Sequence, residues 1–235
     1  MRPISPKSPI NPMGLISPMS SVRAVIFDLD GTLTDTLQDL CDSTNYALRQ
    51  MGWPERSLAE VRCFVGNGVR KLIERAVPEC ISNKDFEQCF SIFQAYYLEH
   101  CQDTTCLYEG VAEMLCDMHS QGYKTAIVSN KLQAGVDELY QAYFRDVVDV
   151  AIGEREGVRR KPAPDMVCLA LRELGVNKDE AVYVGDSEVD VETARNSGLP
   201  CICVLWGFRD REQLVEAGAT TFIHHPRELL EILGK

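Results

Sequence analysis

The sequence predicts an α/β protein: a doubly wound, Rossmann-like parallel sheet with helices on both faces and an inserted helical domain. Two observations lead to this prediction. From residue 124 onward, short apolar runs alternate with segments of helical periodicity. In contrast, residues 36–105 show helical periodicity only, although apolar runs precede and follow them. A helical stretch of this length between two strands is typical of an insertion.

The first segment, residues 1–20, is expected to be a disordered, Pro/Ser-rich tail. Its prolines recur among serines and it contains no acidic residue. Such a sequence can form neither a packed helix nor a central strand. It also lacks the amphipathic helix or the apolar core of a targeting peptide.

The first strand is expected at residues 22–27, an apolar run followed by Asp28 and Asp30. Side chains two residues apart on an extended chain point the same way, so the two carboxylates share one face. Two unit charges about 4 Å apart repel by roughly 4 kcal/mol at an effective dielectric near 20. A divalent cation, a shared proton or full solvation must offset this repulsion, and Mg²⁺ prefers carboxylate oxygens.

After the tail, the chain divides into two predicted domains, a helical cap and a core. Residues 36–105 form the predicted helical cap, whereas residues 21–35 and 106–235 form the predicted core. Within the core we expect strands at 124–128, 147–151, 181–185 and 200–204, and helices at 131–143, 164–174, 188–197 and 209–217. In open parallel sheets, ligands bind at the carboxyl ends of the strands.

Polar residues follow the strand 124–128 and precede the helix 164–174. Ser129 and Asn130 come directly after the strand 124–128 and before a helix, where backbone amides attract anions. Lys161 stands just before a helix that Pro164 can start. Taken one at a time, these residues also fit an ordinary helix cap and an exposed loop lysine.

Two further acidic residues follow the strand 181–185. Asp190 lies one helical turn beyond Asp186 and therefore on the same face. The pair favours a metal site, although acidic residues in a first helical turn also interact well with the helix dipole.

The segment from Asp28 to Asp35, Asp-Leu-Asp-Gly-Thr-Leu-Thr-Asp, resembles the first motif of the haloacid dehalogenase-like phosphohydrolases, most closely their phosphoglycolate phosphatase-like branch. The resemblance covers nearly all of residues 22–235. It implies the strand order 3-2-1-4-5 and a helical cap.

The resemblance also implies a role for each residue. Asp28 would attack phosphorus to form an aspartyl-phosphate, and Asp30 would act as general acid and then as general base. According to the resemblance, the phosphate-binding residues are Ser129, Asn130 and Lys161. The Mg²⁺ ligands that it implies are Asp28, Asp30 and Asp186, supported by Asp190.

The segment 64–71 resembles the cap loop of the same branch. Glycines on both sides of Asn67 allow the backbone to approach a ligand closely. We expect Asn67, Gly68 and Arg70 to meet the substrate, with Arg70 binding a carboxylate; a turn that starts a surface helix is the alternative. The segment 206–209 also matches the branch, but the sequence assigns it no chemical role.

Composition limits the partners. A net charge of −11 disfavours nucleic acid and anionic membranes. The ten cysteines contain no Cys-x-x-Cys pair and are expected to be buried free thiols, with Cys116, Cys168, Cys201 and Cys203 in apolar patterns. Free thiols favour a cytoplasmic location. We expect a monomer or homodimer whose partner is a small phosphorylated metabolite.

The predicted function is a Mg²⁺-dependent phosphatase that hydrolyses a small, phosphoglycolate-like monoester through an aspartyl-phosphate. An inorganic pyrophosphatase and a sugar-phosphate mutase on the same scaffold remain alternatives, as does a non-catalytic phospho-binding regulatory protein. A haloacid dehalogenase uses neither the second aspartate nor a metal, so Asp30 and Asp186 argue against it.

Overall fold

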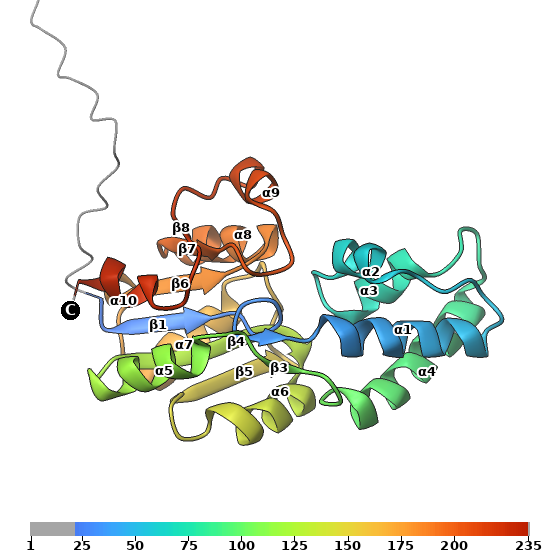
Figure 1. Cartoon of the computed structure of the whole chain (residues 1–235), viewed down its shortest axis with the longest axis horizontal. Coiled ribbons are helices and arrows are strands. Elements are labelled where there is room, and N and C mark those ends of the chain that lie inside the picture. Colours follow the sequence, from blue (N-terminus) through green and yellow to red (C-terminus); the bar gives the residue numbers. More distant parts are fainter. Residues whose placement is uncertain (1–21, 235) are drawn as a thin grey trace, which may run out of the picture.

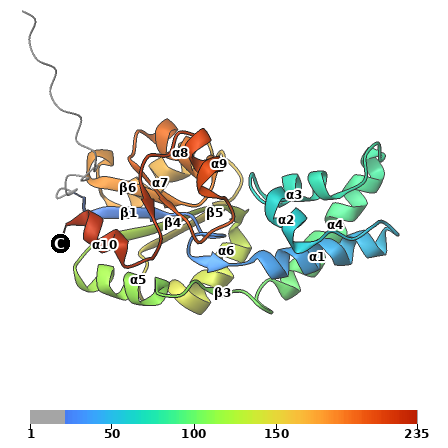
Figure 2. The same cartoon turned by 45° about the horizontal axis from the view of Figure 1, so that its top comes forward.

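The computed structural model describes residues 22–234, so the predicted tail lies outside the described residues. Figure 1 shows two parts of the molecule, an α/β core and a group of helices, α1 to α4, that extends from one edge of it. The second view, turned by 45°, shows the same separation (Figure 2).

Within the described residues, six parallel strands form the core sheet in the order β5-β4-β1-β6-β7-β8. The strands are β1 (Ala24–Phe27), β4 (Lys124–Leu132), β5 (Val150–Glu154), β6 (Ala181–Gly185), β7 (Cys201–Val204) and β8 (Phe222–Ile223). The predicted order of the first five is confirmed. The two-residue strand β8 was not predicted because so short a segment has no periodicity.

Both faces of the sheet are covered, as expected for a doubly wound fold. Val25 and Phe27 of β1 pack on one face, and Ala24 and Ile26 pack on the other. Helices α5 (Val111–Ser120), α6 (Gln133–Leu139) and α10 (Glu228–Leu233) cover the first face; α7 (Asp165–Leu174) and α8 (Glu188–Ser197) cover the second. Helix α9 (Arg211–Glu216) packs beside β7 and β8. The central strand β1 is therefore buried along its whole length.

Predicted boundaries of β4, α6 and β5 are wrong, and those of β4 and α6 affect the site. Strand β4 continues to Leu132, and α6 begins only at Gln133 and passes into a π-helical turn at Tyr140–Phe144. Ser129 and Asn130 therefore belong to an irregular strand end rather than to a helix N-terminus. Strand β5 begins at Val150 rather than at residue 147, because residues 145–147 form a turn. The backbone N–H of Asp149 donates to the Thr125 carbonyl of β4 just before the strand starts.

The cap consists of α1 (Leu37–Gln50), α2 (Leu58–Phe64), α3 (Val69–Ala76) and α4 (Asn83–His100). It has its own apolar core. Strands β2 (Thr34–Asp35) and β3 (Cys106–Leu107) pair antiparallel where the chain leaves and re-enters the core. The buried Asp39 of α1 accepts hydrogen bonds from the backbone N–H groups of Thr104 and Thr105, which joins the two crossings.

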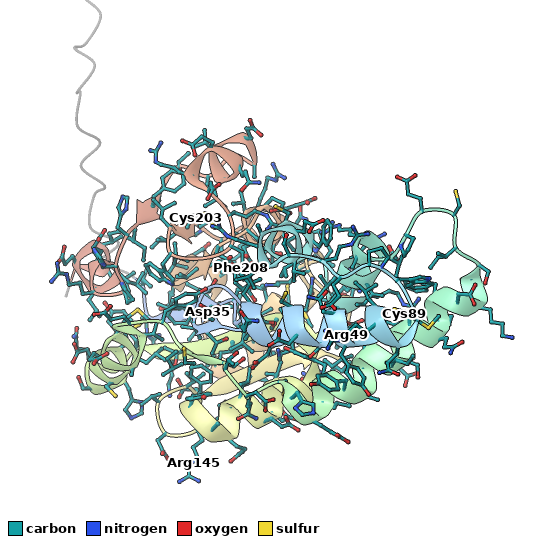
Figure 3. All side chains as sticks on the ribbon, turned by 45° about the vertical axis from the view of Figure 1, so that its right-hand side comes forward. Asp35, Arg49, Cys89, Arg145, Cys203 and Phe208 are labelled. Carbon is teal, nitrogen blue, oxygen red and sulfur yellow. The ribbon has the colours of Figure 1, made fainter. Side chains whose placement is uncertain are left out.

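All ten cysteines are free, as predicted, but their expected burial is only partly correct. Cys203 is buried in the core, and Cys89 is buried in the cap (Figure 3). Cys116 and Cys168 are exposed, because they lie on the outer faces of α5 and α7. No helix among residues 22–234 is long and apolar enough to cross a membrane.

Candidate active site

A pocket lies between the carboxyl ends of the central strands and the cap. Its volume is about 70 Å³. The core residues that line it include Asp28, Asp30, Ser129, Asn130, Lys131, Lys161 and Asp186, and the cap residues include Val65, Gly66, Asn67, Gly68 and Tyr97. The fold thus brings together side chains that are more than 150 positions apart in the sequence.

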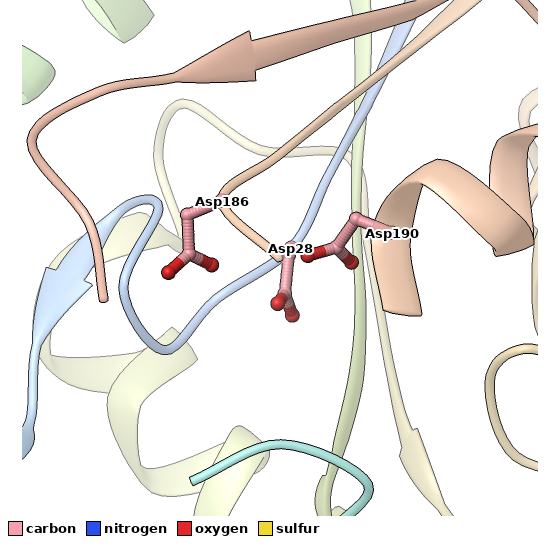
Figure 4. A group of neighbouring side chains, drawn as sticks. All are labelled: Asp28, Asp186 and Asp190. Atoms are coloured by element: carbon pink, nitrogen blue, oxygen red, sulfur yellow. The ribbon is translucent and has the colours of Figure 1, made fainter. Parts of the chain in front are cut away.

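Three carboxylates converge at this pocket: Asp28 after β1, Asp186 after β6 and Asp190 in α8 (Figure 4). One oxygen from each lies within 4.8 Å of the others. A set of oxygen donors alone, all from carboxylates, suits a hard cation such as Mg²⁺. The residues present therefore fit a divalent metal.

The carboxylate of Asp190 is already engaged on both oxygens. Oδ1 accepts hydrogen bonds from Lys161 Nζ at 2.8 Å and from the Tyr183 hydroxyl at 3.0 Å. Oδ2 accepts from the backbone N–H and the hydroxyl of Ser187. Burial acts to raise the pKa of Asp190, but Lys161, together with the hydrogen bonds from Ser187 and Tyr183, outweighs burial and holds that pKa below its usual range. This geometry suits a residue that supports the site rather than one that is free to bind a metal.

Asp186 is held by the loop that follows β7. The backbone N–H of Phe208 donates to its Oδ2 at 2.7 Å, and the Thr32 hydroxyl donates to Oδ1 at 3.3 Å. A Cβ on Gly31, whose φ is +88°, or on Gly207 would come within 2.3 Å of this side chain. Both positions therefore require glycine. Burial and the nearby Asp190 raise the pKa of Asp186 to about 7.

Asp28 faces Lys161, whose Nζ lies 2.8 Å from Asp28 Oδ1. The backbone N–H of Leu29 donates to the same oxygen at 2.7 Å. Burial and Asp190 raise the pKa of Asp28 well above its usual range, and Lys161 offsets them only in part. A divalent cation beside Asp28 and Asp186 would favour their charged forms.

Lys161 is buried and is held by its backbone as well as by its ion pairs. The backbone N–H of Lys161 donates to Asn130 Oδ1 at 2.8 Å, and Asn130 Nδ2 donates to the backbone carbonyl of Lys161 at 3.0 Å. The side chain of Asn130 therefore fixes the loop that carries Lys161. Next to it, the buried Ser129 Oγ accepts from the backbone N–H of Lys131 at 3.2 Å.

The carboxylate of Asp30 lies outside the group of three and pairs with a lysine that was not predicted. Lys131 Nζ is 3.2 Å from Asp30 Oδ1 and also donates to the hydroxyl of Tyr97, a residue of cap helix α4. Burial acts to lower the pKa of Lys131, but Asp30 and Tyr97 hold it above its usual range. A lysine directly after Ser129-Asn130, at the end of an apolar strand, was the available signal. The helical spacing of Tyr97 predicted only a place in the cap core.

Of the three predicted cap residues, Asn67 and Gly68 line the pocket. Asn67 has a φ of +64° and Gly68 one of +83°, so the loop turns sharply at this point. Arg70 does not line the pocket: it binds Glu87 through two hydrogen bonds of 2.9 Å and stacks on the Phe90 ring. The structure thus commits Arg70 to contacts within the cap.

The segment 206–209 connects the core to the cap. Trp206 Nε1 donates to the Thr32 carbonyl at 3.0 Å. The buried Arg209 binds Glu188 and donates to the carbonyl of Val65, at 2.6 Å, in the cap loop. A role for this segment could not be assigned from the sequence because its partners lie far away in the chain.

Residues 25–204 match the family model of the haloacid dehalogenase-like hydrolases. The chain belongs to this family. A phosphoglycolate phosphatase from Pseudomonas putida is 31% identical, with 88% of this chain and 78% of that protein covered. An N-acetylmuramic acid 6-phosphate phosphatase from Pseudomonas aeruginosa is 28% identical, with 91% and 96% covered.

Solved structures agree with this assignment. A crystal structure from Lactobacillus delbrueckii subsp. bulgaricus, provisionally described as a phosphoglycolate phosphatase, superposes with a TM-score of 0.86 at 36% identity. The superposition covers 91% of this chain and 99% of that one. The predicted membership of the family and of its phosphoglycolate phosphatase-like branch is confirmed.

Proposed function

We propose that this hydrolase is a Mg²⁺-dependent phosphatase that cleaves a small phosphate monoester through an aspartyl-phosphate intermediate. The observation that supports this most strongly is the position of Asp28, which lies in the pocket between Lys161 and Asp186. A carboxylate in such surroundings can act as a nucleophile towards phosphorus, because the site can balance the charge of the carboxylate.

In the first half-reaction, Asp28 attacks phosphorus and the bond to the ester oxygen breaks. Lys161 and Ser129 bind the phosphoryl oxygens, whose charge must be neutralised during transfer. Asn130 contributes by holding the Lys161 loop. Asp30 protonates the departing oxygen.

In the second half-reaction, Asp30 removes a proton from water, which then attacks the phosphorus of the aspartyl-phosphate and releases inorganic phosphate. The cap covers the pocket and limits access of solvent during both steps. The Asp28 and Asp186 carboxylates would hold the metal, whereas the Asp30 carboxylate lies outside this group beside Lys131 and serves in proton transfer. When bound, Mg²⁺ would supply positive charge beside the phosphoryl oxygens.

Small carboxylated esters, with phosphoglycolate as the reference, are the proposed substrates. The phosphoglycolate phosphatase from P. putida supports this choice. A volume of 70 Å³ corresponds to about five to seven water-sized groups, enough for a phosphoryl group and a few atoms more. A sugar 6-phosphate is the second candidate, favoured by the similarity to the N-acetylmuramic acid 6-phosphate phosphatase, and it would require the cap to open.

A panel of phosphate compounds tests the proposal. Phosphoglycolate, pyrophosphate, hexose phosphates and nucleotides are compared by kcat/KM with Mg²⁺ and with EDTA. We expect phosphoglycolate to rank first and EDTA to stop turnover until Mg²⁺ is restored. A pyrophosphate preference, or conversion of a hexose phosphate into its isomer, would support one of the alternatives instead.

A further inference from the structure

We infer that Lys131 and Tyr97 form a leaving-group subsite that selects esters bearing an anionic oxygen close to the phosphate, as in the phosphate esters of 2-hydroxy acids. This inference rests on the proposed function, since it concerns the other half of the same substrate. Neither residue has a role in the mechanism described above.

The location of Lys131 follows from that of Asp30. A general acid must lie within about 2.6–3.2 Å of the oxygen that it protonates. Lys131 Nζ contacts the same carboxylate at 3.2 Å. The ammonium group therefore lies on the leaving-group side of Asp28, near atoms one or two bonds away from the ester oxygen.

The donors of Lys131 are not all used within the protein. An ammonium group has three N–H donors. One is directed to Asp30 and one to the hydroxyl of Tyr97, and both Lys131 and Tyr97 line the pocket. The third donor of Lys131 and the hydroxyl hydrogen of Tyr97 can bind an oxygen of the leaving group.

The charge of Lys131 favours an anionic partner. Its side chain is buried, and a buried charge is costly unless it is paired. Lys161 binds two carboxylates, Asp28 and Asp190, whereas Lys131 binds one carboxylate and a neutral phenol. A carboxylate on the substrate would give Lys131 a second anionic partner. The ammonium group would then lie between that carboxylate and Asp30.

The other cations are less suitable. Lys161 and Arg209 are the remaining lysine and arginine side chains that line this pocket among the described residues. Lys161 faces the nucleophile, and the guanidinium of Arg209 binds Glu188 and cap carbonyls. Arg70, the predicted carboxylate-binding residue, pairs with Glu87 outside the pocket. Lys131 is thus the lining cation with capacity for the leaving group.

The test compares phosphoglycolate with 2-hydroxyethyl phosphate, an ester of similar size whose leaving group carries no charge. The quantity measured is the ratio of their kcat/KM values for the full-length protein with Mg²⁺. We expect the wild type to favour phosphoglycolate and Lys131→Met to lower the ratio by roughly 10- to 100-fold, the usual effect of losing a hydrogen bond to a charged group. Any harm to Asp30 affects both esters and cancels in the ratio.

Tyr97→Phe provides a second variant that keeps the aromatic ring, and we expect it to lower the ratio several-fold. Tyr96→Phe, whose ring stacks on Tyr46, and the exposed Lys178→Met are the matched controls and should leave the ratio unchanged. Circular dichroism verifies that each variant folds. If Lys131→Met does not fold, the Tyr97→Phe ratio decides.

The outcomes separate the two proposals. An unchanged ratio in folded Lys131→Met, or in Tyr97→Phe if Lys131→Met does not fold, would overturn the inference and leave the phosphatase proposal intact. If the wild type hydrolyses neither ester, the proposed substrate class fails, and calorimetric binding of phosphoglycolate to wild type and Lys131→Met then tests the subsite by itself. Equal binding to both proteins would again overturn it.

Discussion

The two buried lysines of the site each contact aspartate and a tyrosine hydroxyl, but Lys161 takes its partners from the core alone and Lys131 takes them from the core and the cap. Lys161 lies within the core, where Asp28, Asp190 and Tyr183 surround its ammonium group. Lys131 lies between the core and the cap, because Asp30 comes from the strand end and Tyr97 comes from α4. The comparison indicates that the core alone positions the phosphoryl half of the site, whereas the cap completes the leaving-group half.

The sharpest test of the phosphoryl half is Asp28→Asn. We expect turnover to fall below detection, since the amide cannot serve as the nucleophile, while the fold is retained. Enzyme-catalysed release of inorganic phosphate is the measurement, and the exposed Asp117→Asn is the matched control. Substantial turnover by pure Asp28→Asn would remove Asp28 from its proposed role.

Lys161→Met should damage both activity and stability. Removing this cation leaves Asp28 and Asp190 as buried carboxylates without their partner, a change that typically costs about 3–5 kcal/mol. The free energy of unfolding, measured by urea denaturation, and kcat are the two readouts. Lys178→Met should change neither, and a Lys161→Met protein of wild-type stability would contradict the structural role of these ion pairs.

The stabilisation of the protein by Mg²⁺ should depend on pH, because Asp186 is one of the proposed metal ligands. The pKa of Asp186 is raised from 3.8 to about 7, so its protonated form is favoured in the folded state. The associated stability is present below the pKa of the unfolded chain and is lost as the pH rises towards 7. Mg²⁺ binds the deprotonated form, so the rise in Tm on adding Mg²⁺ should be larger at pH 7.5 than at pH 5.5. A rise in Tm that does not depend on pH would argue against Asp186 as a ligand.

Contacts between core and cap should affect substrate binding more than chemistry. Arg209→Lys cannot reproduce the hydrogen bonds of the guanidinium to Glu188 and to the Val65 carbonyl. We expect KM to rise by about tenfold, as for one lost charge-assisted hydrogen bond, with a smaller change in kcat. Steady-state kinetics test this, with the exposed Arg145→Lys as the control (Figure 3). A decrease in kcat alone would place Arg209 in the chemical step.

The smallest effect is expected for Arg70→Ala. The Arg70 and Glu87 side chains are 40% and 47% exposed, so solvent screens the pair and it contributes little to stability. The kcat/KM for phosphoglycolate should change less than twofold. A loss comparable to that of Lys131→Met would restore Arg70 as the carboxylate-binding residue predicted from the sequence.

Local patterns were sufficient for much of the core. The apolar run before Asp28 and the alternation after residue 124 predicted the parallel sheet, and the motif residues indicated which strand ends meet. The register at the end of β4 was not accessible, because Ser129 and Asn130 fit a helix cap as well as an irregular strand. The placement of Arg70 was equally inaccessible, since Glu87, its partner, lies on another cap helix.

The sequence by itself determined the fold class, the family and the residues gathered at the strand ends, because periodicity and short motifs are local properties of the chain. Only the tertiary structure decided which carboxylates share one place, that Asn130 holds the Lys161 loop, and that Lys131 meets Tyr97. The carboxylates and the Asn130–Lys161 pair join distant segments within the core, and Lys131 with Tyr97 joins the core to the cap. Such pairing depends on how the strands are ordered in the sheet and how the cap packs over it, which no local pattern encodes.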